Sequence, residues 1–161
     1  MEIKNSIEII DITHNDLVDL FSVALCGNTY MSAEYDSDFY KSIPDDKKEG
    51  ECFEDHLADV LLNGGHIFIY DAYSEGELYS ENAELITEEY GCETYAQYKI
   101  TLKDVIRGLE RAASGTYKTN NDDKFIRQCF DDLITDDSYN LDLIEGDALM
   151  QIITFNEYIY G

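Results

Sequence analysis

Carboxylates dominate the chemistry that is open to this sequence. The 161 residues include 35 Asp and Glu against 11 Lys and Arg, which gives a formal net charge of −24. Duplex DNA carries one charge per ~1.7 Å of its axis, so the same charge is found on about 41 Å of duplex. A compact chain of this length has a diameter of roughly 40 Å. The protein therefore carries about as much charge as a piece of DNA of its own size.

The acids are unevenly placed along the chain. Residues 71–93 hold eight acids and no base, whereas residues 99–127 hold seven of the eleven bases. Because the 71–93 segment also lacks regular apolar periodicity, we expect its carboxylates to be exposed and free of internal partners. The candidate partner-binding residues are these acids, followed by four acids nearer the C-terminus: Asp71, Glu75, Glu77, Glu81, Glu84, Glu88, Glu89, Glu93, Asp131, Asp132, Asp136 and Asp137.

An acidic surface suits a decoy that occupies the basic groove of a nucleic-acid enzyme, because Lys and Arg release counterions to carboxylates much as to phosphates. The alternative is a solvated coat that only keeps the protein soluble. A net charge of magnitude about 2–8 is enough to keep a small domain soluble. Self-repulsion at −24 destabilises the compact state, so we expect some benefit to offset it.

The same charge excludes two classes of partner. A protein of pI near 4.1 does not bind nucleic acid by neutralising phosphates, and it does not bind an anionic membrane surface. No segment approaches the eighteen or so consecutive apolar residues of a membrane span. The first residues carry acids where a signal peptide needs its apolar run. We therefore expect a cytoplasmic protein.

Metal binding has only partial patterns behind it. Leu141 occupies the position of the turn glycine of an EF-hand loop, and Asp147 replaces its bidentate Glu, so a helix-capping loop is the preferred interpretation. Cys52 and His56 share a helical face at i and i+4 but have no matching second pair. We expect no metal and no cofactor. The residues that partly copy the EF-hand ligands are Asp136, Ser138, Asn140, Asp142 and Asp147.

Neither the spacing of the cysteines nor a catalytic motif indicates a function. The four cysteines at 26, 52, 92 and 129 form no CxxC pair, and we expect free, mostly buried thiols. The sequence contains no GxSxG, HExxH, P-loop or GxGxxG motif, and none of the three histidines has a nucleophile at a meaningful spacing. With 35 acids, a chance pair of carboxylates is expected. The sequence therefore predicts a protein that is not an enzyme.

One helix is expected to carry most of the positive charge. Lys103, Arg107 and Arg111 follow one another at i, i+4 and i+8. Pairing with neighbouring acids of the same chain is the simpler interpretation. The alternative is that the stripe docks on an acidic patch of a second copy, which would make a homodimer.

The elements that position these residues belong to one domain, 1–161, because no linker or repeat divides the chain. Thr13 with Asp16, and Thr101 with Asp104, are capping-box starts of helices. The segment 71–93 is expected to form a loop or an edge hairpin. The pattern predicts an α+β fold with a small antiparallel or mixed sheet and about five helices. The strands are expected at 6–12, 29–35, 66–70 and 95–100, and the helices at about 14–26, 53–62, 102–114, 122–134 and 143–155.

Four stretches resemble a largely uncharacterised group of small acidic proteins carried by phages and mobile elements of gut Firmicutes. They are DITHNDLVDLFSVALCGN (11–28), LADVLLNGGHIFIYD (57–71), ITLKDVIRGLERAA (100–113) and DALMQIITFNEYIYG (147–161). This resemblance implies a mobile-element setting and no catalytic residues. In size and acidity the chain is also similar to anti-CRISPR and anti-restriction DNA mimics, without shared motifs.

Together these observations predict an inhibitor of a host nucleic-acid-targeting defence enzyme. Its acidic face would bind the basic groove of a CRISPR effector or a restriction complex and block access of DNA or guide RNA. The alternative is an acidic adaptor that binds a basic protein without mimicking DNA. A small hydrolase or metal-dependent enzyme has no motif in its favour.

Overall fold

Segments with alternating apolar residues form a four-stranded antiparallel sheet in the computed structural model, which describes residues 11–87, 94–118, 123–135 and 141–161. The strands are β1 (Met31–Tyr35), β2 (His66–Asp71), β3 (Ala83–Thr87) and β4 (Thr94–Thr101). Their order in the sheet is β1-β2-β4-β3. The predicted extended segments at 29–35, 66–70 and 95–100 are confirmed. The edge-hairpin interpretation of 71–93 is confirmed in part, because β3 pairs with β4 at one edge.

The two faces of the sheet differ in burial. On β2, Ile67, Ile69 and Asp71 are buried, whereas Phe68 and Tyr70 on the opposite face are only half-buried. This alternation is expected of an antiparallel sheet with one face on the core and one towards solvent. The sheet face that carries Phe68 and Tyr70 is therefore only partly covered by the described residues.

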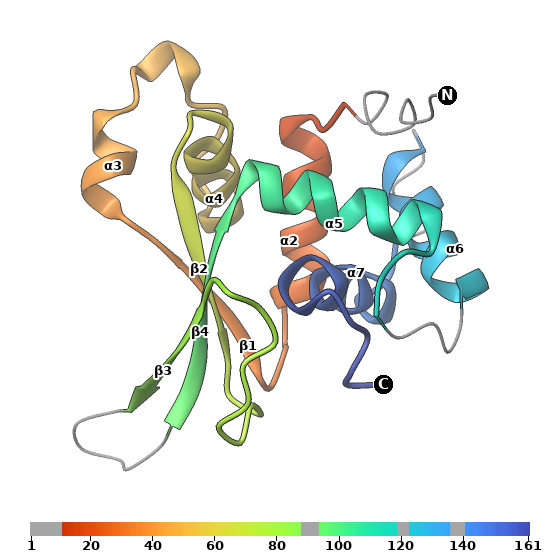
Figure 1. Ribbon diagram of the computed structural model, residues 1–161. Coiled ribbons are helices and arrows are strands. Elements are labelled where there is room, and N and C mark those ends of the chain that lie inside the picture. Colours follow the sequence, from red (N-terminus) through yellow and green to blue (C-terminus); the bar gives the residue numbers. More distant parts are fainter. Residues whose placement is uncertain (1–10, 88–93, 119–122, 136–140) are drawn as a thin grey trace, which may run out of the picture.

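Six α-helices accompany the sheet in the described part of the chain, and together they make a single α+β domain (Figure 1). Thr13 and Thr101 both accept a hydrogen bond from the backbone N–H of the predicted Asp, and each Asp accepts one in return, so both capping boxes are confirmed. The helices are α2 (His14–Leu25), α3 (Ser37–Ser42), α4 (Phe53–Leu62), α5 (Leu102–Ser114), α6 (Asp123–Ile134) and α7 (Leu143–Phe155), with a 3-10 turn at Asp45–Lys47.

Three local expectations differ from the structure. Residues 11 and 12 are not in a strand, and the rest of the predicted 6–12 strand lies outside the described residues. Helix α3 and the 3-10 turn were not predicted, because six and three residues are too few to show an apolar period. Phe53 belongs to the apolar pattern that predicts the 53–62 helix, but as the first residue of α4 it is 44% exposed, whereas Leu57 and Val60 are buried.

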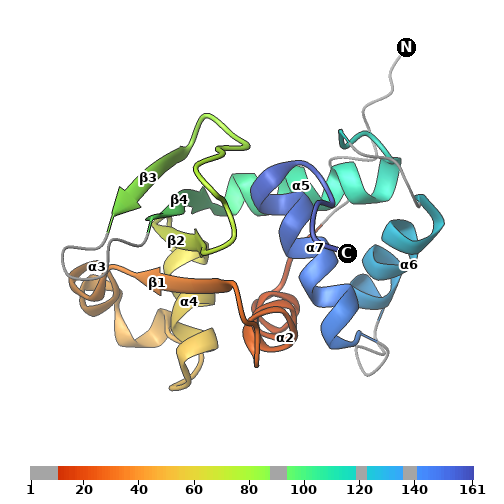
Figure 2. The same cartoon turned by 90° about the horizontal axis from the view of Figure 1, so that it is seen from below.

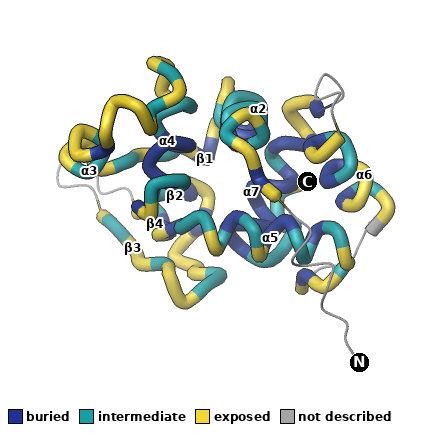
Figure 3. The backbone as a smooth tube through the Cα atoms, turned by 90° about the horizontal axis from the view of Figure 1, so that it is seen from above, coloured by how far each residue is buried: buried dark blue, intermediate teal, exposed yellow. Residues whose placement is uncertain are grey.

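Helix α7 lies at the centre of the molecule, with α2, α5 and α6 around it (Figures 1 and 2). Every residue from Ala148 to Phe155 is buried, and Figure 3 shows the contrast with the exposed α3. Two glycines permit close helix packing. A Cβ on Gly108 of α5 would lie 2.6 Å from Ile153 Cα, and a Cβ on Gly146 of α7 would lie 2.4 Å from Val23 Cγ2 of α2. Both contacts need a residue without a side chain.

We expect Gly108→Ala to lower the free energy of unfolding by about 1–2 kcal/mol. Alanine is the better helix former by about 1 kcal/mol, but overpacking typically costs about 1–3 kcal/mol. Because the added Cβ would lie 2.6 Å from a backbone atom of Ile153, which cannot rotate away as a side chain can, we expect a cost of about 2–3 kcal/mol. Denaturant unfolding measures the difference. Lys103→Ala, on an exposed position of the same helix, is the control and should not be destabilising. An unchanged stability of Gly108→Ala would mean that α5 and α7 separate without cost.

Candidate functional site

Asp71 does not belong to the exposed acidic surface. Its side chain is completely buried, so the expectation that its carboxylate is exposed and free of internal partners is wrong. The Tyr160 hydroxyl donates a hydrogen bond of 2.9 Å to Asp71 Oδ2, and the Tyr73 backbone N–H donates one of 2.8 Å to Oδ1. Burial raises the pKa of Asp71, while these two hydrogen bonds lower it. The residue continues the alternation of Ile67 and Ile69, so the period of β2 carried the signal that the sequence analysis missed.

The next four predicted acids are exposed, as expected: Glu75, Glu77, Glu81 and Glu84. Two of them accept internal hydrogen bonds. The Tyr79 hydroxyl donates to Glu77 over 2.9 Å, and Gln97 Nε2 donates to Glu84 over 3.4 Å. None of the four forms an ion pair with a described Lys or Arg. Glu88, Glu89 and Glu93 lie outside the described residues.

The predicted acids on α6 are partly used inside the protein. Asp131 pairs with Arg127 at 3.1 Å, and Gln128 Nε2 donates to Asp132 over 2.7 Å. Asp132 also shares a hydrogen bond with the buried Glu145. Burial, followed by this contact, raises the pKa of Glu145 from 4.5 to about 7. Asp136 and Asp137 lie outside the described residues.

The solvent-facing side of the sheet combines acidic and aromatic side chains. Tyr70 OH donates to Glu34 Oε2 over 2.7 Å, and the Tyr70 and Tyr95 rings meet edge to face at 5.5 Å. Sequence reasoning missed Glu34, because only strand pairing places β1 and β3 on the two edges of this face. We call it the open sheet face and define it by Ser32, Glu34, Phe68, Tyr70, Glu84, Tyr95, Gln97 and Lys99.

Three basic side chains lie close to Glu81, one of the predicted acids. Arg107, Arg111 and Lys118 line a cleft of about 420 Å³, and Glu81 lines it with them. In the part of the chain that the structure describes, the predicted stripe of Lys103, Arg107 and Arg111 forms no ion pair within 4.0 Å. The expected pairing with neighbouring acids is therefore not found there. Docking of the stripe on a second copy stays a prediction.

A buried polar network ties α7 to the sheet and to the C-terminal tail. Tyr30 OH donates to Asp147 Oδ1 over 2.5 Å, and Gln151 Nε2 donates to Asp147 Oδ2 over 2.8 Å. Gln151 Oε1 accepts from the backbone N–H groups of Ile159 and Tyr160, both over 2.8 Å. Asp147, which the EF-hand comparison considered as a ligand, is thus held by donors of the protein itself.

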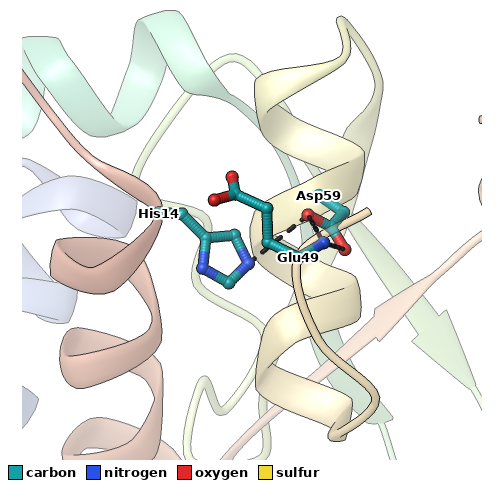
Figure 4. Close-up of side chains that lie close together, drawn as sticks. All are labelled: His14, Glu49 and Asp59. Atoms are coloured by element: carbon teal, nitrogen blue, oxygen red, sulfur yellow. Dashed lines mark hydrogen bonds and ion pairs between the residues drawn. The ribbon is translucent and has the colours of Figure 1, made fainter. Parts of the chain in front are cut away.

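A second cluster lies between the start of α2 and helix α4, where His14 faces two carboxylates (Figure 4). His14 Nε2 lies 3.3 Å from Asp59 Oδ1 and 3.5 Å from Asp55 Oδ1. The backbone N–H of Glu49 donates to both oxygens of Asp59, at 3.3 and 3.2 Å. Donor atoms of His14, Glu49 and Asp59 all lie within 4.8 Å of one another. Sequence reasoning did not find this cluster, because its members come from separate elements.

The described cysteines and His56 show no arrangement that points to catalysis or metal binding. Cys129 is buried, whereas Cys26 and Cys52 are exposed, so the expectation of mostly buried thiols is wrong for these two. Burial raises the pKa of the Cys129 thiol. His56 Nδ1 and Tyr35 OH form a hydrogen bond of 2.7 Å, and the two rings pack edge to face. Cys92 lies outside the described residues.

Comparison with known proteins assigns no family to this chain. No protein-family model, no curated protein and no solved structure matches it. None of the described helices has the length and apolar character needed to cross a bilayer.

We expect the stability of the protein to fall between pH 5 and pH 8 through Glu145. Its pKa is about 7 in the folded state, so the folded protein holds the proton more tightly than the unfolded chain. The stabilisation is complete below the unfolded pKa of about 4.3 and is lost as the pH rises through the folded pKa. Glu145→Gln should flatten this slope and raise the unfolding free energy at pH 8 by on the order of 1 kcal/mol.

Denaturant unfolding at pH 5, 6, 7 and 8 measures the slope. The control is Glu84→Gln, which changes the net charge equally at an exposed position and should keep the parent slope. Identical slopes for Glu145→Gln and the parent would contradict the assignment.

Proposed function

We propose that this protein inhibits a host nucleic-acid-targeting defence enzyme by binding its basic groove. A CRISPR effector or a restriction complex is the proposed target, and blocked access of DNA or guide RNA is the proposed effect. The proposed contact surface is the open sheet face, and Glu75 and Glu77 in the loop between β2 and β3 are further exposed acids that a partner could contact. Catalysis by the protein itself has no part in this proposal.

One observation carries the proposal: few of the described carboxylates are neutralised by cations. Lys48 with Asp45, and Arg127 with Asp131, are the ion pairs of Lys or Arg in the described ranges. The exposed carboxylates among the described residues are therefore largely available to an external partner. Carboxylates that keep their charge attract Lys and Arg over distances up to about a Debye length, ~8 Å at physiological salt.

The composition of the open sheet face supports a partner rich in arginine. A guanidinium pairs with a carboxylate and also stacks on an aromatic ring. Glu34 lies beside Tyr70, and Tyr70 lies beside Tyr95, so both kinds of contact are offered together. Because the Tyr70 hydroxyl holds Glu34 in place, less side-chain entropy is lost on binding.

Basic residues of the protein itself lie beside some of its acids, so not every acid is equally suited to bind a basic groove. Glu81 shares a cleft with Arg107, Arg111 and Lys118, so its charge is partly offset by its neighbours. Lys99 lies on the open sheet face itself. Equal contributions from all acids of the 71–93 segment are therefore not expected, and Glu34, Glu77 and Glu84 are the better choices for a test.

The second candidate function is an acidic adaptor that binds a basic protein without mimicking DNA. The aromatic rings of Phe68, Tyr70 and Tyr95 favour it, because a protein interface is enriched in aromatic residues whereas a phosphate backbone presents none. Competition separates the two candidates. A DNA mimic is displaced by DNA from its target, and an adaptor binds together with DNA.

We expect the protein to inhibit DNA cleavage by a CRISPR effector or restriction enzyme from a purified panel, and inhibition should weaken steeply from 50 to 300 mM salt. The triple variant Glu34→Gln, Glu77→Gln, Glu84→Gln should bind that enzyme about 100-fold more weakly, if each contact contributes about 1 kcal/mol. Binding is measured by titration against the enzyme with and without its DNA.

The control is a triple variant with the same change in charge, Asp11→Asn, Asp46→Asn, Glu51→Gln, at exposed positions outside the open sheet face. It should bind with nearly the parent affinity. Equal loss in both variants would show that only total charge matters. Absence of inhibition across the panel, or affinity that stays flat with salt, would overturn the proposal.

A further inference from the structure

We propose that His14, Glu49 and Asp59, with Asp55 beside them, bind a divalent transition-metal ion of the Zn²⁺ class. This site is separate from the open sheet face, and the inference does not depend on the proposed function. It assigns a cation site to a chain whose sequence predicted none. The ion would join the first turn of α2 to α4 and to the loop that precedes α4.

The first argument is an unsatisfied nitrogen. The His14 side chain is only 9% exposed, and its Nε2 atom is buried without a hydrogen-bond partner. Buried polar atoms in folded proteins nearly always have a partner. Nε2 lies within ion-pair distance of the carboxylates of Asp55 and Asp59 but makes a hydrogen bond with neither. An ion held between these groups would supply the missing contact.

The second argument is the spacing of the donor atoms. Zn²⁺ binds His nitrogen and carboxylate oxygen at about 2.0–2.2 Å in a tetrahedron, and the edge of such a tetrahedron is about 3.4 Å. His14 Nε2 lies 3.3 Å from Asp59 Oδ1 and 3.5 Å from Asp55 Oδ1. Both separations are close to the length of one tetrahedral edge. The donors of His14, Glu49 and Asp59 lie within 4.8 Å of one another, so a bound ion would draw the Glu49 carboxylate, which is on an exposed residue, towards the other two ligands.

The third argument is that local structure holds these groups in place. Asp55 is the capping-box residue of α4, and its Oδ2 accepts from the Cys52 backbone N–H over 3.1 Å, which leaves Oδ1 towards His14. A Cβ on Gly50 would lie 2.2 Å from Asp55 Cγ, so the loop packs directly on this carboxylate. Asp59 is oriented by the Glu49 backbone N–H. Such outer contacts are what keep metal ligands in position.

The electrostatics of the cluster agree with a bound cation. Asp59 is 1% exposed, and a carboxylate out of water is costly unless a positive charge compensates it. Carboxylates with one imidazole form a donor set that suits Zn²⁺ or Mn²⁺. A protonated His14 between the two carboxylates is the competing explanation, and it predicts no specific affinity for metal.

The test uses the purified full chain, stripped with chelator, and titrates Zn²⁺ by calorimetry in the presence of excess Mg²⁺ to occupy surface carboxylates. We expect one tight site per chain, and a rise in Tm of about 5 °C or more at a hundredfold excess over Kd. Co²⁺ serves as a spectroscopic probe, because a tetrahedral site gives an intense visible band that octahedral surface carboxylates do not.

The deciding variant is His14→Gln, with His66→Gln as the matched control at a half-buried histidine on the other face of the sheet. His14→Gln should lose the Co²⁺ band and weaken Zn²⁺ binding about 100-fold or more, since even an outer partner of a ligand is worth about 10–100-fold. Asp59→Asn, which keeps the acceptor for Glu49, should do the same. His66→Gln should bind like the parent.

Unchanged Zn²⁺ affinity in His14→Gln, or no stoichiometric site in the parent, would overturn the proposal in favour of the protonated histidine. Melting curves in chelator check that each variant is folded before metal is added. These results concern the isolated protein, so they are independent of whether a defence enzyme is its target.

Discussion

The burial of α7 is the constraint on which the rest of the structure depends. From Ala148 to Phe155 this helix is buried on all sides and must be enclosed by other elements: α2, α5 and α6 pack around it (Figure 1), and Phe155 contacts Tyr98 of β4. Gly108 and Gly146 set how closely α5 and α2 approach, because a side chain at either position would collide with the facing helix. The place of α2 then fixes His14 opposite α4, and the place of α5 fixes the strand β4 from which it continues.

The buried part of α7 must also satisfy its polar side chains. Gln151 does so by donating to Asp147 and accepting from the backbone of Ile159 and Tyr160, which holds the C-terminal tail against the core. Tyr160 in turn donates to Asp71 of β2. Two carboxylates of a strongly acidic chain are thereby structural, since losing a partner would leave a buried charge or acceptor unsatisfied.

The carboxylates therefore serve different ends according to where the fold places them. Asp71, Asp147 and Glu145 belong to interior hydrogen-bond networks, whereas Glu34, Glu77 and Glu84 face solvent without a cation within ion-pair distance among the described residues. Only the second group supports recognition of a basic partner. The Arg107 cleft and Lys99 divide this negative surface, so the field is less uniform than the net charge suggests.

The sequence by itself determined five of the six described helices and three of the four described strands, because capping boxes, helical apolar periods and strand alternation are local signals. Thr13 with Asp16 and Thr101 with Asp104 show this. It also contained the alternation that places Asp71 inward. Tertiary structure alone decided that Glu34 and Glu84 share one sheet face and that His14 meets Asp55 and Asp59. These juxtapositions depend on strand order and on the packing of α2 against α4, which arise from long-range burial and leave no pattern along the chain.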